Sequence, residues 1–434
     1  MSGPERIVAV VVAVLVLAGV IVVGLNVSGG DNGVAASPSA SPALSASASA
    51  QASAEPSASA DASPDDEDTL AVLREIEEQV IDIRGLPAAD IGPPEIITRA
   101  ELADELEQLF EEEYPPEEQE RDNIALRALG LLEPGQDVAE LQLQLLGDQV
   151  LGFYDDVDKR MVVVSDAGLD AEAKLTYAHE YTHALQDAAF GLDSLQTDEV
   201  GEDDRALART AMIEGDATVT MLAWAFAYLT PEELMQIGTG AVPDTSGIPS
   251  WMVEQLQFPY NEGALWAGAL TVNPTQPDFD ALDAAYDDPP DSTEQIIDVA
   301  AWPDGDEPVP VDGVDLAAAL GDGWSEVDVT PIGQATIEIM LGYLGVDRAV
   351  ATEAADGWGG DTAVIASGPD DAFAVAWRLV WDEASDADEL VDAYETAIGA
   401  LDFPATVELL PDGEVLVVHA SSADLLDQVL AAAR

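Results

Sequence analysis

The chain has no cysteine among its 434 residues. This absence excludes disulfide bonds, thiolate metal sites and a lipidated cysteine anchor. It does not fix the compartment, because exported proteins can also fold without disulfides.

Basic residues are also scarce. Fourteen lysines and arginines stand against 86 aspartates and glutamates, which makes the formal net charge −72, and the only lysines are Lys159 and Lys174. Phosphate groups are bound by clustered lysine and arginine, so we expect no nucleic-acid partner. An apolar content of 48% argues against general disorder. The acidic surface instead predicts a halophilic protein, adapted to a saline setting where salt screens its self-repulsion.

The N-terminus carries a targeting segment. Residues 7–25 form an uncharged apolar run of 19 residues, which is long enough to span a hydrocarbon core of roughly 30 Å. It is longer than the usual signal-peptide core, so we expect an uncleaved transmembrane signal-anchor at residues 1–27. Arg6 should remain in the cytoplasm, which makes this a single-pass cell-membrane protein with its other parts outside. The alternative is cleavage near "GVAAS" at 33–37, which would make the protein secreted.

Composition divides the rest of the chain into three parts. Residues 28–66 are rich in serine, alanine and proline and predict a flexible, disordered stalk. Residues 67–325 predict a mostly helical domain that contains one short β-hairpin. Residues 326–434 predict a separate C-terminal α+β module of ββαββα type, which makes the fold class α+β.

Apolar periodicity predicts the elements around the hairpin. The spacing of Thr98 and Glu101 indicates a capping box at a helix start. Short apolar runs flank the polar turn at 155–159 and predict the hairpin strands. The predicted helices lie at 68–86, 98–114, 123–132, 138–146, 171–190, 204–229 and within 258–270.

Two of only three histidines stand four residues apart in the predicted helix 171–190, in the stretch "AHEYTHALQD". Residues at this spacing share one face of a helix, so His179 and His183 can direct ring nitrogens at one point. Neutral imidazole is a preferred zinc ligand. Glu180 lies beside them, where it can act as general base on a water that zinc activates. The pattern is the H-E-x-x-H motif, and a simple pair of packed histidines is the alternative.

A catalytic zinc needs a third protein ligand. Glu214 stands out because it interrupts an apolar helix, where a glutamate is costly unless it is paired or bound to metal. Gly215 beside it would permit close approach to the helix that bears the two histidines. The alternative is an ordinary carboxylate paired with an arginine such as Arg209.

Three other residues are weaker candidates for the metal site. Asp187 follows His183 by about one helical turn, and Asp216 could act in a supporting position behind the ligands. His419 lies in the C-terminal module, more than two hundred residues away, and is expected to be structural.

In these motifs the sequence resembles the gluzincin metallopeptidases, the thermolysin-like enzymes that bind zinc with two histidines and one glutamate. The residues that carry this resemblance are "HEYTH" on one helix and a Glu-Gly step on the next. Their separation is longer than that of thermolysin and closer to that of bacterial collagenases. The wider set "GFYD", "EGDA", "FPYNEG", "PPDSTEQI" and "GWGGD" is similar to a family of exported bacterial HExxH proteins. The resemblance covers about residues 70–400 and implies a zincin-like domain. It implies His179, His183 and Glu214 as ligands and Glu180 as the catalyst.

The resemblance also implies how a peptide is held. A strand edge beside the zinc commonly binds the substrate backbone, and "RMVVVS" at 160–165 is the fitting segment. A tyrosine or histidine often stabilises the oxyanion. Tyr260 is the candidate here, with Tyr154 and Tyr181 behind it.

These observations predict a membrane-anchored, extracytoplasmic zinc metallopeptidase that acts on a peptide or protein substrate. One alternative is a non-catalytic cell-surface interaction protein that retains the fold. Another is a salt-adapted structural protein of the cell envelope, which would bind no zinc. The intact Glu180 favours the enzyme, because a binding module has no need of a general base.

Overall fold

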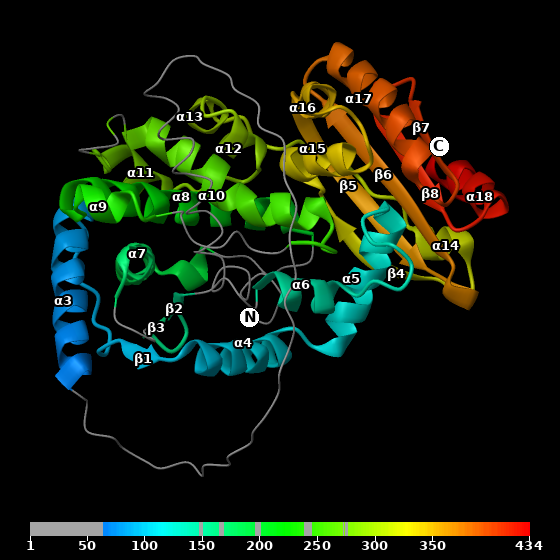
Figure 1. The fold of residues 1–434 in the computed structure, drawn as a ribbon. Helices are drawn as coiled ribbons and strands as arrows, with labels where there is room; N and C mark the ends of the chain where they lie inside the picture. The colour runs from blue at the N-terminus through cyan, green and yellow to red at the C-terminus, as the bar shows by residue number, and fades with distance from the viewer. Residues whose placement is uncertain are drawn as a thin grey trace, which may run out of the picture.

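The computed structural model describes residues 64–146, 151–164, 169–195, 201–237, 245–271, 273 and 277–434. The predicted signal-anchor, the possible cleavage site and the stalk up to residue 63 lie outside the described residues. Within the described ranges, no helix is long and apolar enough to cross a membrane. Helices predominate and two separate sheets are present (Figure 1), so the predicted α+β class is confirmed.

Four helices begin the described chain and overlap the predicted ones: α3 (Pro64–Arg84), α4 (Arg99–Glu113), α5 (Pro116–Leu129) and α6 (Val138–Leu146). Helix α3 begins within the predicted stalk, and α5 begins seven residues before the predicted start at 123. The capping box at the start of α4 is present. The Thr98 hydroxyl accepts a hydrogen bond from the Glu101 backbone N–H (3.2 Å), and the Glu101 carboxylate accepts one from the Thr98 N–H (2.8 Å). These bonds satisfy amide groups that a helix start otherwise leaves unpaired.

The predicted hairpin forms part of a three-stranded sheet made by β1 (Glu95–Ile97), β2 (Gly152–Asp155) and β3 (Arg160–Val164). Strands β2 and β3 are antiparallel, and β1 pairs parallel with the other side of β3. The order is therefore β1-β3-β2, with β3 in the centre. The expectation that residues 160–165 offer a free strand edge is wrong, because β1 occupies that edge. The edge strand of the hairpin is β2.

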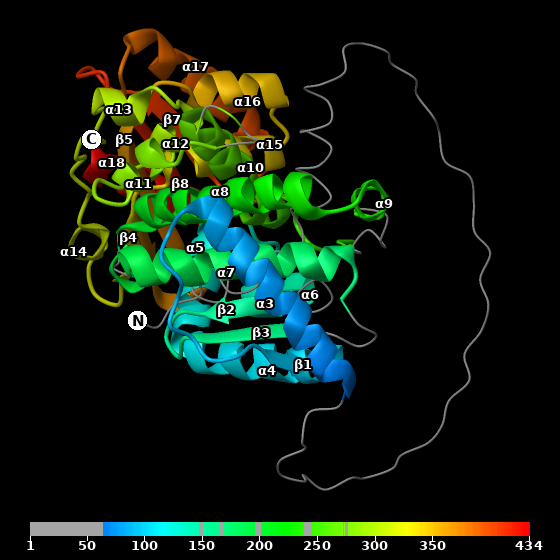
Figure 2. The ribbon, with the colours of Figure 1, turned by 90° about the vertical axis from the view of Figure 1, so that its left-hand side faces the viewer.

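This sheet lies between α4 on one face and α7 (Ala171–Phe190) on the other (Figures 1 and 2). Alternate residues along a strand point to opposite faces. Val162 accordingly belongs to the hydrophobic cluster that contains Leu102 of α4. Val163 belongs to the cluster that contains Leu175 of α7.

The long helices of the first part are α7, α8 (Asp203–Tyr228) and α10 (Ser250–Thr271), with the short α9 (Pro231–Leu234) after α8. Helix α7 begins where the Asp170 side chain accepts a hydrogen bond from the Ala173 N–H (2.9 Å), and it ends at Gly191, which is left-handed (φ 75°). A glycine adopts this conformation without steric cost, so it terminates the helix. The stripe predicted to be buried, Leu175, Ala178, Thr182 and Leu185, has no exposed surface.

Short elements connect α10 to the C-terminal module, and a few others lie in loops. They are α11 (Asp280–Ala285), α12 (Glu294–Ile297), α13 (Ala301–Asp304), α14 (Leu316–Leu320), η1 (Leu192–Ser194), η2 (Pro369–Asp371) and η3 (Ile398–Ala400).

The C-terminal module contains a five-stranded antiparallel sheet in the order β4-β5-β6-β8-β7. After α16 its elements run β5, β6, α17, β7, β8, α18, which is the predicted ββαββα order, whereas β4 and α16 were not predicted. The bounds are β4 (Ser325–Thr330), α15 (Gly333–Tyr343), α16 (Arg348–Ala355), β5 (Trp358–Ser367), β6 (Phe373–Trp381), α17 (Ala384–Ala397), β7 (Ala405–Leu409), β8 (Val415–Ala420) and α18 (Ala423–Ala433).

Helices cover both faces of this sheet. Val375 and Trp377 of β6 pack in the cluster that includes α5, α16 and α17. Ala374 and Ala376 point to the opposite face, which α14 and α18 cover. Helix α5 belongs to the first part of the chain, so the module does not bury its sheet alone.

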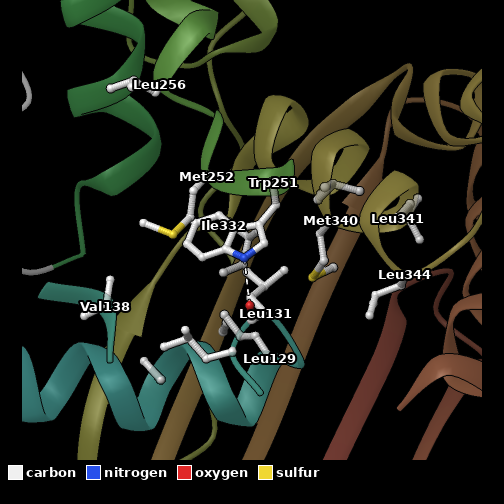
Figure 3. Close-up of a cluster of buried hydrophobic side chains, with 14 of the residues drawn as sticks. Leu129, Leu131, Val138, Trp251, Met252, Leu256, Ile332, Met340, Leu341 and Leu344 are labelled. Atoms are coloured by element: carbon white, nitrogen blue, oxygen red, sulfur yellow. Dashed lines mark hydrogen bonds between the residues drawn. The ribbon is translucent and has the colours of Figure 1, made fainter. Parts of the chain in front are cut away.

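A continuous hydrophobic core joins the two parts of the chain. Trp251 at the start of α10 packs among residues of the α5–α6 connection and of α15, and its indole N–H donates to the Leu131 carbonyl (2.7 Å) (Figure 3). The parts of the chain on either side of the boundary predicted between residues 325 and 326 therefore share one packed interior. The division into two domains stays a prediction.

A buried carboxylate also ties the C-terminal sheet to α15. Asp361 of β5 accepts hydrogen bonds from the backbone N–H groups of Ile332 (2.8 Å) and Gly333 (2.9 Å) at the start of α15. The indole N–H groups of Trp358 and Trp377 donate to the same carboxylate (2.8 Å each). An anion at a helix N-terminus is favoured by the helix dipole, so this contact fixes α15 on the sheet.

Candidate metal centre

Helix α7 places both histidines of the motif on one buried face. His179 is 2% exposed and His183 is 7% exposed. Their ring centroids are 4.7 Å apart, and their Nε2 atoms approach to 3.0 Å. Two imidazole nitrogens therefore point at one position, as the four-residue spacing predicted.

Helix α8 brings Glu214 to the same position. Its Oε2 lies 2.9 Å from Nε2 of His179 and 3.4 Å from Nε2 of His183. These three atoms form a triangle with edges of 2.9, 3.0 and 3.4 Å. Ligand atoms around a tetrahedral zinc with bonds of 2.0–2.1 Å stand about 3.3–3.4 Å apart, so the triangle is close to the required size.

The donor set suits zinc. Two imidazole nitrogens and one carboxylate oxygen are the protein ligands of a common catalytic zinc site, which leaves a fourth position open. The three residues are buried, and they form one of the groups in the described part of the chain that could hold a metal ion. The structure thus brings together the three predicted ligands, and their binding of zinc stays a prediction.

Glu180 is held beside this cluster by the hairpin. Its side chain is buried, and Oε2 accepts a hydrogen bond from the backbone N–H of Tyr154 in β2 (3.0 Å). Burial raises the pKa of Glu180 to about 8, with a further contribution from the negative charge of Glu214. A carboxylate with a pKa near neutrality is well matched to general-base work at that pH.

Tyr260 reaches the cluster from α10. Its ring centroid lies 6.0 Å from that of His179. Burial, the charges of Glu214 and Glu180, and a hydrogen bond with Glu214 together raise the pKa of Tyr260 well above its ordinary value. The hydroxyl therefore keeps its proton and is a hydrogen-bond donor beside the site.

The predicted role of Gly215 requires a correction. A Cβ atom at Gly215 would lie 2.1 Å from the carbonyl oxygen of Gly263 in α10, and one at Gly263 would lie 2.0 Å from the carbonyl oxygen of Ala211. The glycine thus permits α8 to contact α10, and not α7 as its position beside Glu214 suggested. The same close contact holds α10 against the histidine cluster, and this places Tyr260 beside it.

A hydrogen-bonded chain behind His183 fixes its tautomer. The Gln186 amide nitrogen donates to the Ile213 carbonyl and to Oδ2 of Asp216 (3.0 Å each), and both partners can only accept. The amide oxygen of Gln186 must then face Nδ1 of His183, 2.8 Å away. Nδ1 therefore carries the hydrogen, which leaves the Nε2 lone pair of neutral His183 aimed at the metal position.

Asp216 is in turn held by buried partners. Arg84 at the end of α3 donates to both of its carboxylate oxygens (2.8 and 3.0 Å), and the Tyr286 hydroxyl donates to Oδ2 (2.7 Å). Arg84 also pairs with Asp283. Burial would lower the pKa of Arg84, but these carboxylates raise it, so the ion pair persists across the working pH range.

Without metal, the cluster is an internal ion pair. Burial would raise the pKa of Glu214, but the charge of His183 and hydrogen bonds from both imidazoles hold it well below the ordinary value. Burial also lowers the pKa of His179, whereas the Glu214 carboxylate raises that of His183. A proton shared among these groups competes with a metal ion, so metal binding should strengthen as pH rises.

The alternative ligands lie elsewhere. The Asp187 carboxylate accepts from the Tyr154 hydroxyl (2.8 Å) and pairs with Lys159, which attaches the end of α7 to the hairpin. Asp216 supports Gln186, as its predicted position behind the ligands suggested. Arg209 pairs with Asp291 and not with Glu214.

The remaining candidates are structural. His419 of β8 is fully buried between the Tyr394 hydroxyl and the Ala128 carbonyl, far along the chain from the motif. Tyr181 stacks on Tyr177, with ring centroids 6.3 Å apart, and its hydroxyl forms a hydrogen bond with the backbone of Ala89. Both side chains pack in the interior, as was expected of His419.

Sequence reasoning missed Gln186, Arg84 and Tyr286. Gln186 could have been predicted from its spacing, because it follows His183 by three residues and so lies on the same helix face. Arg84 and Tyr286 carried none, since they come from elements 132 and 70 residues away from Asp216.

Comparison with known proteins gives one match. A family model described as "Domain of unknown function (DUF8575)" matches residues 323–430, which span β4 to α18. No curated protein and no solved structure matches the chain. The matched segment includes none of the residues of the histidine cluster.

Proposed function

We propose that this chain is a zinc metallopeptidase of gluzincin type, anchored in the membrane by residues 1–27 and facing outward. The observation that carries the proposal is the convergence of His179, His183 and Glu214 on one buried point. Glu180 stands beside that point with a raised pKa. A pair of packed histidines would not need a buried carboxylate on each side.

Each residue has a role in the proposed reaction. His179, His183 and Glu214 would hold the zinc ion, which when bound would act as a Lewis acid that lowers the pKa of water and polarises the peptide carbonyl. Glu180 accepts a proton from the attacking water and delivers it to the leaving amine. Tyr260 donates a hydrogen bond where negative charge develops on the carbonyl oxygen.

The substrate backbone is proposed to pair with β2. Among the strands that the structure describes, β2 lies at an edge of its sheet, and the Tyr154 N–H, which donates to Glu180, points away from β3. An extended peptide added at this edge would run beside the general base. This assignment replaces β3, which lies between two other strands.

The test is metal analysis of the purified full-length chain, coupled to a peptide-library digest with and without chelator. We expect about one zinc per chain and chelator-sensitive hydrolysis. Glu180→Gln keeps the size of the side chain but cannot accept the water's proton. We expect zinc to stay bound in this variant while hydrolysis falls by orders of magnitude.

Glu172→Gln is the matched control, because it removes a carboxylate from the first turn of the same helix. It should leave hydrolysis unchanged. Zinc without hydrolysis in the parent chain would favour the non-catalytic interaction protein, and no zinc at all would favour a structural protein. Undiminished turnover in Glu180→Gln would show that Glu180 is not the base.

A further inference from the structure

Three carboxylates from separate segments converge at the junction between the helical part and the C-terminal sheet. They belong to Glu294 at the start of α12, Asp306 just after α13 and Asp382 just after β6. One oxygen from each lies within 4.8 Å of the other two. Glu294 is only 7% exposed, whereas both aspartates are exposed.

Within the part of the chain that the structure describes, none of these three side chains has a hydrogen bond or an ion pair. Two other buried carboxylates in the described part of the chain are hydrogen-bonded. Asp361 accepts four N–H donors, and Asp204 accepts from both the backbone N–H and the hydroxyl of Thr293. Glu294 is therefore a buried, unpartnered acid that points into a cluster of two further acids.

This arrangement is unfavourable as it stands. A largely buried carboxylate without a partner loses part of its hydration, and like charges at this separation repel each other. Burial and the charges of Asp306 and Asp382 raise the pKa of Glu294 to about 8. A bound cation would remove both the desolvation cost and the repulsion.

We propose that Glu294, Asp306 and Asp382 form a binding site for a hard divalent cation, and that calcium fits it best. The donors are all carboxylate oxygens, which hard cations prefer. Ligands on opposite sides of a calcium ion stand about 4.6–5.2 Å apart at bonds of 2.3–2.6 Å, so three oxygens within 4.8 Å of one another are close enough to share one ion. The exposure of the two aspartates leaves room for the water molecules that complete the coordination shell.

The site would act as a clamp on the fold. Asp306 lies in the connection that runs onto β5, where the Val309 N–H donates to the Gly359 carbonyl (2.7 Å). The Asp382 backbone N–H donates to the Gly357 carbonyl (3.0 Å), so it is seated at the same end of the sheet. A cation shared with Glu294 would tie α12 to this end of the C-terminal module. This site uses none of the residues of the histidine cluster, so its test stands apart from the proposed hydrolysis.

The test uses the full-length chain, stripped of metal and held in molar potassium chloride to screen non-specific cation binding. Calcium is titrated by calorimetry, with magnesium as a second probe. We expect one saturable calcium site with a Kd of about 10⁻⁴–10⁻³ M, the range of extracellular calcium modules. Saturating calcium should raise the melting temperature by several degrees.

Glu294→Gln should abolish this calcium site and, because it relieves the repulsion, should raise the melting temperature of the calcium-free chain. Asp382→Asn removes a ligand from an exposed position, so it keeps the test decisive if the buried substitution prevents folding. Glu326→Gln in β4 is the control for loss of one exposed charge and should leave calcium binding unchanged. An equal calcium effect in the parent chain and in both ligand variants would overturn the proposal.

The rival explanation is a proton shared among the three acids. The pKa of Glu294 is raised from 4.5 to about 8, so its protonated form stabilises the folded chain. This stabilisation is complete below about pH 4.5 and is lost as pH rises toward 8. With calcium, this loss of stability between pH 5 and 8 should disappear from the parent chain. A loss that calcium does not alter, with no saturable binding, would favour the shared proton and overturn the metal site.

Discussion

Gln186 connects the proposed zinc site to the interior of the protein. One end of its amide accepts from His183, and the other donates to Asp216, which is paired with Arg84. The orientation of the imidazole is therefore set by groups that never touch a metal or a substrate. Such partners usually contribute to metal affinity by holding the ligand in one tautomer and one direction.

Gln186→Leu should weaken zinc binding by about 10–100-fold, because it leaves Nδ1 of His183 without its acceptor and removes one of the donors to Asp216. The measurement is zinc affinity by chelator competition, with the fold checked by circular dichroism. Gln428→Leu on the exposed face of α18 is the matched control and should bind zinc as the parent chain does. Parent-like zinc affinity in a folded Gln186→Leu chain would mean that this residue does not position His183.

At the scale of elements, the contact between α8 and α10 determines how the site is assembled. Glu214 and Tyr260 come from these two helices, and Gly215 and Gly263 let their backbones approach without intervening side chains. The helices cannot maintain this contact if either glycine gains a methyl group, since a Cβ would overlap a carbonyl oxygen on the other helix. Close packing of this kind leaves no room for adjustment by a side-chain rotation.

Gly215→Ala should destabilise the protein by about 1–3 kcal/mol and displace α10, even though alanine favours helices. The measurement is the midpoint of denaturant unfolding, together with zinc affinity. Gly268→Ala in the same α10 meets nothing within 4 Å and is the control. It should raise stability by roughly 0.5–1 kcal/mol through helix propensity alone. Equal effects of the two substitutions would show that the α8–α10 contact is not tight.

At the scale of the whole molecule, a net charge of −72 acts on every part of the fold. Few of these charges are neutralised, because only 14 basic residues are available to pair with 86 acids. The folded state concentrates the remaining charge into a smaller volume than the unfolded chain does. Self-repulsion therefore opposes folding at low ionic strength.

We expect the melting temperature to rise steadily as potassium chloride increases from low to molar concentration, because salt screens this repulsion. Thermal melts followed by circular dichroism would measure it. The rise should be gradual and should persist in Glu294→Gln, which separates screening from saturable calcium binding. A flat or falling melting temperature would contradict adaptation to a saline setting.

Short-range patterns in the sequence determined much of this protein. The bounds of α7, the capping box of α4 and the β2–β3 hairpin follow from spacings within about 20 residues, because helix and strand periodicities are local. The convergence of His179 and His183 is local too, since four residues make about one helical turn. The ββαββα order of the C-terminal module could be predicted from the sequence for the same reason.

Tertiary structure alone decided what comes from distant parts of the chain. It brought Glu214 to the two histidines, paired β1 with β3 so that β2 became the edge, and set Gly215 against Gly263. It also joined Arg84 to Asp216 and gathered Glu294 with two aspartates. No local sequence pattern predicts these contacts. Each of them depends on how the surfaces of two distant segments fit together, and that fit is decided by close packing in the core.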